Sequence, residues 1–367
     1  MIRVVFLLSS ILFVFNAFSA EKKYIGVVDV GSTGARLHVY AQSDHATPME
    51  EVWVKKITPG FSSLKPEQAY IDNYLNELFQ AAPRNFPVYF YATAGMRLLP
   101  SEEQNKYYDA VRAWFKRSAW NLQEAKTITG REEGVFAWLS LYEKLNEKSD
   151  IEVPQHLSVM DMGGASVQVV SAVDSKIEAN QKDYIEVNLH GKSQTLFVHS
   201  FLGLGKTSVS EQFLDEPSCF SDGYPLPDGS LGAGNATRCV EHISKLIDGV
   251  HDVHRTLHPA LDAAEVKNWY VMAGLAYLIE EAPFNQNQHE ITNDALLQQA
   301  DRAVCHRPWH ALQSAYPDDK YLSRACLAAS YYYALMRAYD IKPSEPIHLV
   351  SNSTSTDWTL GVALHNG

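Results

Sequence analysis

The chain has 367 residues, 46% of them hydrophobic, and a formal net charge of −12. This apolar content is typical of a well-packed globular protein and excludes a disordered chain. The acidic balance excludes attraction to nucleic acid through a bulk electrostatic field, so an anionic ligand would need a local site and a metal ion. Because the length exceeds what one hydrophobic core usually organises, we expect two domains.

The first segment is typical of a secretory signal peptide. Arg3 precedes a largely apolar run over residues 4–14, and small residues follow. Cleavage after Ser19 fits the small-x-small rule best, with Ala20 as the alternative. The run is shorter than the about 20 residues of a membrane-spanning helix. We therefore expect residues 1–19 to be removed and the mature protein to be secreted or periplasmic, without a membrane partner; an uncleaved anchor is the alternative.

A β-hairpin is predicted over residues 24–40, where two β-prone runs flank a turn of small residues at 31–34. Successive backbone N–H groups in such a turn form an anion-binding nest. Asp29 lies at the end of the first run, where a carboxylate can hold a hydrated Mg²⁺ or Ca²⁺ opposite the nest. An ordinary glycine hairpin is the alternative for this stretch taken alone.

The next part of the chain alternates helices with strands, which favours an α/β sheet with sites at the strand ends. The predicted elements are helices over 66–80, 101–120 and 130–145, and strands over 88–93 and 127–129.

Two adjacent glutamates, Glu132 and Glu133, follow Gly130 at a predicted strand-to-helix junction. Acidic residues at a helix N-terminus are also ordinary capping residues. Beside a phosphate clamp, however, hydrolysis of a phosphoanhydride needs a group that orients the attacking water and accepts its proton. We expect Glu133 to be that base.

A second hairpin over residues 159–170 repeats the pattern of the first, with Asp161 at the end of one run and small residues at 163–166. Two nests and two carboxylates that face each other would grip a chain of phosphates and its metal from both sides. Two unrelated glycine turns are the alternative, and the matching positions of Asp29 and Asp161 argue against it.

The second half of the chain has a similar alternation. Strands are predicted over 184–200, 265–272 and 347–351, helices over 240–258 and 324–337, and a long Gly- and Pro-rich loop over 215–239. An even number of cysteines in an exported protein suggests disulfide bonds. Three pairings are open, of which sequence neighbours give the simplest, Cys219–Cys239 and Cys305–Cys326.

Two further patterns have simple alternatives. Gly205-Lys206-Thr207 resembles the end of a Walker A loop, but Ser200 stands where that loop needs a glycine. Three histidines at 251, 254 and 258 share one face of a predicted helix, where solvated side chains are favoured over a metal site.

Five ordered motifs resemble known signature regions. Residues 29–36, 91–97, 130–138 and 161–168 are similar to the first four apyrase regions, and 357–361 to the fifth. On these motifs the sequence resembles the ecto-nucleoside triphosphate diphosphohydrolases, in a soluble secreted form, over essentially the whole mature chain.

The resemblance implies an α/β fold of the actin/hexokinase superfamily, with two RNase H-like lobes and the active site in the cleft between them. Lobe I would comprise 20–157, completed by the C-terminal segment from about 340 to 367, and lobe II would comprise 158–339. Each lobe would contain one of the two hairpins. We expect a monomer.

The resemblance also assigns roles by position. Glu133 would be the catalytic base, and Ser166 and Gln168 would hold the attacking water. The phosphate-binding residues would be Ser32, Thr33, Gly34, Ala35, Arg36, Gly163, Gly164 and Ala165. The metal, Mg²⁺ or Ca²⁺ or another divalent cation, would be held mostly through water by Asp29, Asp161 and Thr93.

Supporting residues have alternatives beside the implied role. Arg97 follows a phosphate-site motif and Trp358 would pack beneath the site; a structural role for Arg36 and Arg97, and a core role for Trp358, are the alternatives. A nucleobase would stack on an aromatic ring. Tyr332, then Tyr331, lie in the helix where the family places that ring, against the alternative that both are core or surface residues.

The expected reaction is hydrolysis of nucleoside triphosphates, and of diphosphates, to monophosphate and phosphate through in-line attack of water, without a phosphoenzyme. Tyr142 departs from the asparagine usual in the third region, which leaves the preference between triphosphate and diphosphate open. An exopolyphosphatase of the same superfamily and a nucleotide-binding actin-like module are the alternative functions.

Overall fold

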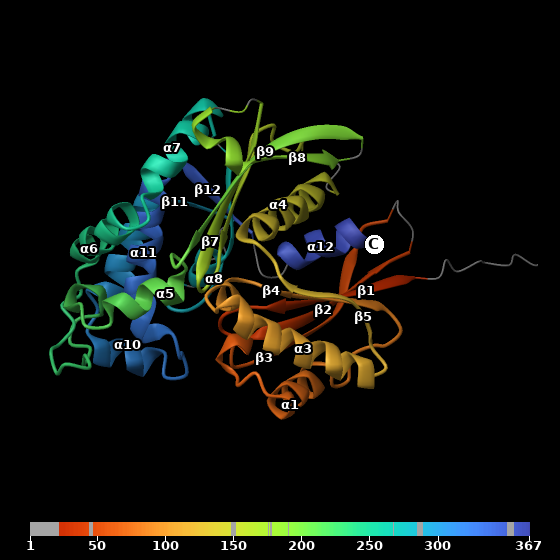
Figure 1. Ribbon diagram of the computed structural model, residues 1–367. Helices are drawn as coiled ribbons and strands as arrows, with labels where there is room; N and C mark the ends of the chain where they lie inside the picture. The colour runs from red at the N-terminus through yellow and green to blue at the C-terminus, as the bar shows by residue number, and fades with distance from the viewer. Residues whose placement is uncertain are drawn as a thin grey trace, which may run out of the picture.

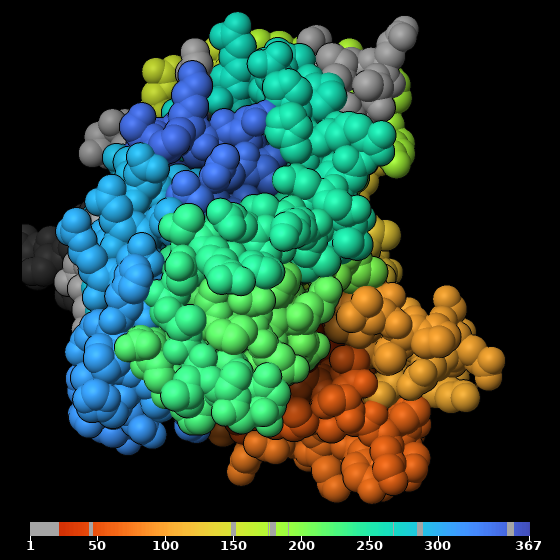
Figure 2. Space-filling model, turned by 90° about the vertical axis from the view of Figure 1, so that its left-hand side faces the viewer, coloured from red at the N-terminus to blue at the C-terminus, as the bar shows by residue number. Residues whose placement is uncertain are grey.

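The computed structural model describes residues 22–43, 47–147, 152–174, 176, 178–189, 191–266, 268–284, 289–350 and 356–367. The predicted signal peptide lies outside these residues. The described chain forms two β-sheets with helices around them (Figure 1), and the segment up to about residue 130 makes a smaller body beside the rest (Figure 2). Among the described helices, none has the length and apolar composition needed to cross a membrane.

The first sheet has five strands in the order β3-β2-β1-β4-β5. Its strands are β1 (Lys23–Val30), β2 (Ala35–Gln42), β3 (Glu50–Ile57), β4 (Pro87–Ala92) and β5 (Asn121–Thr127). The β1 strand pairs antiparallel with β2 and parallel with β4. Helices α1 (Gln68–Leu78) and α3 (Ser101–Arg117) pack on this sheet over a core that includes Phe61, Phe90 and Tyr107.

The second sheet has seven strands in the order β11-β12-β10-β6-β7-β9-β8. They are β6 (Leu157–Met162), β7 (Ser166–Val173), β8 (Tyr184–Leu189), β9 (Lys192–Leu202), β10 (Asn268–Ala273), β11 (Glu290–Thr292) and β12 (Pro346–Leu349). The five strands β9-β7-β6-β10-β12 repeat the pairing of the first sheet, with two antiparallel pairs followed by two parallel pairs. The two lobes are therefore built on one topology.

A layer of helices covers the second sheet. It comprises α5 (Lys206–Ser210), α6 (Ala236–Gly249), α7 (Val253–Ala263), α8 (Gly274–Glu280), α9 (Asn293–Ala300), α10 (Trp309–Ala315) and α11 (Ala325–Ala338). Disulfide bonds join Cys219 to Cys239 and Cys305 to Cys326, so the simplest pairing is the one present. One bond ties the chain before α6 to that helix, and the other ties α11 to the turn after α9.

The two sheets share a core built around α4 (Gly130–Asn146) and the C-terminal α12 (Trp358–Asn366), which lie between them in Figure 1. The core contains Val27 of the first sheet and Val159 of the second together with Trp138 and Trp358. Gly361 of α12 packs against the backbone of Phe136 in α4, so the two helices lie in close contact. The C-terminal segment contributes β12 to the second sheet and α12 to this shared core, and the lobe boundaries stay a prediction.

Two predicted elements differ from the structure. The helix predicted over 240–258 is the pair α6 and α7, because Asp252 takes a left-handed backbone conformation (φ 54°) between them. The strand expected near 127–129 begins earlier, as β5 at Asn121. The residues of this edge strand are mostly polar, so it lacks the alternating apolar pattern that would mark it in the sequence.

Candidate active site

The two predicted hairpins have the same register. In β1–β2, Asp29 lies opposite Arg36, and the Gly31 N–H donates to the Gly34 carbonyl at 2.9 Å. In β6–β7, Asp161 lies opposite Gln168, and the Gly163 N–H donates to the Ser166 carbonyl at 3.1 Å. Each sheet therefore presents the same four-residue turn at the end of its central strand.

The two turns face each other across the space between the sheets. A methyl group added at Gly164 would lie 2.6 Å from Ser32 Oγ and 3.5 Å from Thr33 Cγ2. Glycine at this position lets the turn at 163–166 approach the turn at 31–34 closely. The structure thus brings together the residues predicted to bind phosphate from both halves of the chain.

The Gly205-Lys206-Thr207 motif supports the second turn from behind. The backbone N–H of Lys206 donates to the Gly163 carbonyl at 3.1 Å, and those of Thr207 and Ser208 donate to the Gly164 carbonyl at 2.8 and 3.1 Å. These groups are used within the protein, whereas a Walker loop directs its backbone N–H groups at phosphate. The motif lies at the start of α5, and its hydrogen bonds hold the turn at 163–166 in place.

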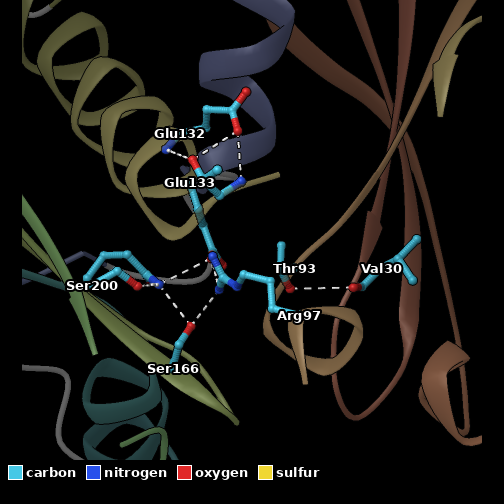
Figure 3. A network of polar contacts seen from close by, with 9 residues as sticks. Val30, Thr93, Arg97, Glu132, Glu133, Ser166 and Ser200 are labelled. Atoms are coloured by element: carbon cyan, nitrogen blue, oxygen red, sulfur yellow. Dashed lines mark hydrogen bonds and ion pairs between the residues drawn. The ribbon is translucent and has the colours of Figure 1, made fainter. Parts of the chain in front are cut away.

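The two adjacent glutamates at the start of α4 have different positions (Figure 3). Glu132 forms a capping box with Thr129: its carboxylate accepts from the Thr129 N–H at 2.7 Å, and its own N–H donates to Thr129 Oγ1. Glu133 points toward Arg97 and is only 7% exposed. The cap thus fixes which of the two carboxylates enters the site.

A compact hydrogen-bond network surrounds Glu133 (Figure 3). Arg97 Nη2 donates to Glu133 Oε2 at 2.6 Å and to Ser166 Oγ at 2.9 Å. Gln168 Nε2 donates to the same carboxylate oxygen at 3.2 Å and to Ser166 Oγ at 2.8 Å. The structure therefore places the four predicted residues Arg97, Glu133, Ser166 and Gln168 in one cluster.

Ser200 is a member of this network that the sequence analysis did not include. Its Oγ accepts from Gln168 Nε2 at 3.0 Å, because β9 pairs with β7 in a register that puts Ser200 opposite Gln168. The sequence signal for Ser200 is the run over residues 199–205, which resembles a lesser feature of the apyrase family.

Several buried polar atoms of the cluster have no partner among the described residues: Gln168 Oε1, Arg97 Nε and Arg97 Nη1. Buried polar groups in folded proteins are nearly always hydrogen-bonded, to protein or to a bound molecule. An acceptor and two donors therefore remain available to a water molecule or an anion beside Glu133.

The site has an excess of buried carboxylates. Burial raises the pKa of Glu133 to about 7, against the opposing effect of the Arg97 guanidinium. Burial, with neighbouring negative charge on Glu133, also raises the pKa of Asp161 well above its usual range. Burial raises the pKa of Asp29, although Arg36 Nη1 lies 3.5 Å from its carboxylate. A divalent cation would relieve this repulsion, so the donor set fits a hard metal ion.

Thr93 lies beside the first turn. It follows β4 and precedes the short helix α2 (Ala94–Arg97), and its N–H donates to the Val30 carbonyl at 3.1 Å. Its hydroxyl donates to the same carbonyl at 3.4 Å (Figure 3). Thr93 is therefore held at the end of β1, next to Asp29.

Aromatic residues of the predicted site are packed inside the protein. Tyr331 and Tyr332 of α11 are both 0% exposed, and the Tyr331 hydroxyl donates to the Leu204 carbonyl at 2.6 Å. In this conformation neither ring offers a face to a nucleobase, which agrees with the core alternative. Trp358 is also buried in the shared core, and the Tyr142 ring stacks on Trp138 with centroids 5.2 Å apart.

Two lobes of one topology, with paired turns in the space between them, define a protein of the actin/hexokinase superfamily. Among solved structures, a nucleoside triphosphate hydrolase from Neospora caninum aligns with a TM-score of 0.61 at 14% identity, covering 94% of this chain and 92% of that one. A Ppx/GppA phosphatase from Aquifex aeolicus aligns with a TM-score of 0.55 at 12% identity, covering 94% and 99%. At these identities the likeness concerns the fold alone.

The family is given by sequence. Residues 16–218 match the GDA1/CD39 (nucleoside phosphatase) family, and the chain belongs to it. Ectonucleoside triphosphate diphosphohydrolase 1 of Mus musculus is 26% identical over 422 residues, covering 94% of this chain and 80% of the mouse protein. The Golgi apyrase of Saccharomyces cerevisiae is 33% identical over 233 residues, covering 51% and 37%.

Proposed function

We propose that this protein is a metal-dependent apyrase, which hydrolyses nucleoside triphosphates and diphosphates to monophosphate and phosphate. The observation that carries the proposal is the position of Glu133, a buried carboxylate hydrogen-bonded beside two facing turns of small residues. Membership of the nucleoside phosphatase family supports the same substrate class. Export to a secreted or periplasmic location is part of the proposal and rests on residues 1–19.

The phosphate chain would lie between the two turns, with backbone N–H groups of residues 32–34 and 164–165 directed at its oxygens. Asp29 and Asp161 would hold Mg²⁺ or Ca²⁺ mostly through water, with the Thr93 hydroxyl nearby. When bound, the ion neutralises charge that develops on the transferred phosphoryl group. Arg36 would add a fixed positive charge beside Asp29.

Glu133 would accept the proton of the attacking water. Its pKa of about 7 matches the requirement for a base near neutral pH, which must be ionised yet still basic. Gln168 Oε1, which has no partner among the described residues, and Ser166 Oγ would hold that water. Since the reaction would then proceed by direct in-line attack of water, no phosphoenzyme would form.

A second candidate function is hydrolysis of linear polyphosphate. The complete burial of Tyr331 and Tyr332 favours it, because these two rings, expected to stack on a nucleobase, do not face the site. Both functions would use the same turns, carboxylates and Glu133.

Phosphate release from ATP, ADP, AMP and polyphosphate, measured with Mg²⁺, Ca²⁺ or EDTA, tests the proposal. We expect release from ATP and ADP, none from AMP, and no activity in EDTA. Glu133→Gln preserves the shape of the side chain and should reduce kcat by several orders of magnitude while nucleotide binding stays measurable. Near-normal turnover in Glu133→Gln would refute the mechanism, and release from polyphosphate alone would favour the second candidate.

A further inference from the structure

A cluster of two histidines and one aspartate lies on the second lobe, in a part of the chain that the proposed catalysis does not use. His254 and His258 are four residues apart on α7, and Asp340 follows α11. Figure 2 shows this side of the molecule, where the teal surface of α7 borders the blue surface of the last part of the chain.

The three side chains converge. His254 Nε2 lies 3.1 Å from Asp340 Oδ1, and His258 Nδ1 lies 2.5 Å from Asp340 Oδ2. The two imidazole rings are stacked, with centroids 4.9 Å apart and planes 12° from parallel. One ligand atom from each residue lies within 4.8 Å of the other two. Histidines at i and i+4 share one helix face, which explains why both reach the same carboxylate.

The third histidine of the predicted face does not take part. His251 precedes α7 and its ring contacts the position of Gly203, where an added methyl group would lie 3.5 Å from His251 Cε1. Arg255, between the clustered histidines, is paired with Asp252 through a hydrogen bond of 2.6 Å from its Nε. The cluster is therefore two imidazoles and one carboxylate, without a competing cation from Arg255.

We propose that His254, His258 and Asp340 bind a transition-metal ion such as Zn²⁺, at a site separate from the proposed catalytic Mg²⁺ or Ca²⁺. Two imidazole nitrogens and one carboxylate form a ligand set that suits Zn²⁺ and its neighbours, whereas Mg²⁺ and Ca²⁺ prefer oxygen ligands. The ion would bind the two ring nitrogens that now lie within hydrogen-bond distance of the Asp340 carboxylate.

The geometry requires only small side-chain movements. With metal–nitrogen bonds of about 2.0–2.1 Å, two nitrogens on a tetrahedral ion lie about 3.3 Å apart. His254, His258 and Asp340 have side chains that are 50%, 48% and 42% exposed, so their torsions can adjust and water can complete the coordination. The bound ion joins α7 to the chain after α11, two segments held at present by hydrogen bonds.

Calorimetric titration with ZnCl₂ tests this site, using the untagged mature chain without nucleotide and with 1 mM Mg²⁺ to occupy oxygen-ligand sites. We expect one Zn²⁺ per chain and an affinity at least tenfold lower in His254→Ala, His258→Ala and Asp340→Asn. Asparagine tolerates the left-handed backbone of Asp340 (φ 60°), so this variant keeps the turn. Melting temperatures without zinc establish that each variant is folded.

His242→Ala is the matched control, because His242 is also partly exposed and lies 3.5 Å from a single carboxylate, that of Glu216. It should bind Zn²⁺ as the unmodified chain does. Equal zinc binding by the unmodified chain and by His254→Ala/His258→Ala, or no binding by the unmodified chain, would overturn the proposal. Neither result would bear on nucleotide hydrolysis, which is measured separately with Mg²⁺.

Discussion

One guanidinium connects the proposed base to the second turn. Arg97 Nη2 contacts both Glu133 Oε2 and Ser166 Oγ, and Arg97 comes from the first lobe while Ser166 belongs to the second. Burial raises the pKa of Glu133 and Arg97 opposes that rise. The proton affinity of the base therefore depends on a guanidinium that also contacts the second lobe.

A pH profile of Arg97→Met measures this dependence. Glu133 must be ionised to accept a proton, so kcat/KM for ATP should rise as pH increases through about 7 and then level off. Loss of the Arg97 charge removes the interaction that lowers the Glu133 pKa, so the midpoint should move to higher pH by about one unit or more.

The control for this profile is Arg117→Met, because Arg117 pairs with Asp72 on the surface of the first lobe. Its profile should match that of the unmodified protein. A midpoint in Arg97→Met that stays in place or moves to lower pH would contradict the role given to Arg97.

At the scale of single residues, the sequence predicts which residues form the candidate site better than it predicts what those residues contact. The motif around Glu133 predicts a carboxylate near the turns, but the partnership of Gln168 with Ser200 depends on how β7 pairs with β9. For Tyr331 and Tyr332, a helix that is buried on nearly every side has no single face to be read from periodicity. Their packing is decided by distant parts of the chain.

At the scale of the structural elements, the turns at 31–34 and 163–166 must approach each other for the proposed site to form. Gly164→Ala places a methyl group 2.6 Å from Ser32 Oγ and 3.2 Å from Thr207 Oγ1, so the Ser32 hydroxyl must be displaced from its position in the first turn. We expect kcat/KM for ATP to fall at least tenfold, because small displacements of positioning groups are costly to catalysis. Steady-state kinetics with purified protein measures the effect.

Gly249→Ala provides the comparison. Gly249 lies at the end of α6, and an added methyl group there meets no atom within 4 Å. This variant should keep full activity. If Gly164→Ala were as active as Gly249→Ala, the close approach of the turns would not matter for the reaction.

The hairpins are predictable at this scale because strand, turn and strand are contiguous in the sequence and the turn residues are diagnostic. The repeated pairing order of the two sheets is not, since β10 and β12 join the second sheet from far along the chain. The break between α6 and α7 depends on one left-handed residue, Asp252, which interrupts an otherwise helical pattern.

At the scale of the whole molecule, the two lobes are stabilised by different kinds of interaction. A shared core around α4 and α12 joins the two sheets, whereas both disulfide bonds lie in the helical layer of the second lobe. Covalent cross-links therefore stabilise one lobe directly, and the other depends on packing.

Replacing Cys219 and Cys239 by alanine removes a cross-link between residues 20 positions apart. The chain-entropy relation for a loop of this length gives a loss of about 3 kcal/mol in the free energy of unfolding. Urea unfolding with and without a reducing agent measures it. The reductant should still destabilise the alanine variant, because it reduces Cys305–Cys326. An unfolding midpoint that is the same after the alanine replacement and after reduction as in the unmodified protein would contradict the prediction.

The shared register of the two hairpins also makes their differences meaningful. At the position opposite the strand-end aspartate, one lobe has Arg36 and the other has Gln168. The first hairpin thus has a charged guanidinium where the second has a neutral amide, and that amide donates to the carboxylate of Glu133. The two hairpins share one register but differ in the charge of this residue, so a linear phosphate chain bound between the proposed turns would meet unlike side chains on its two sides.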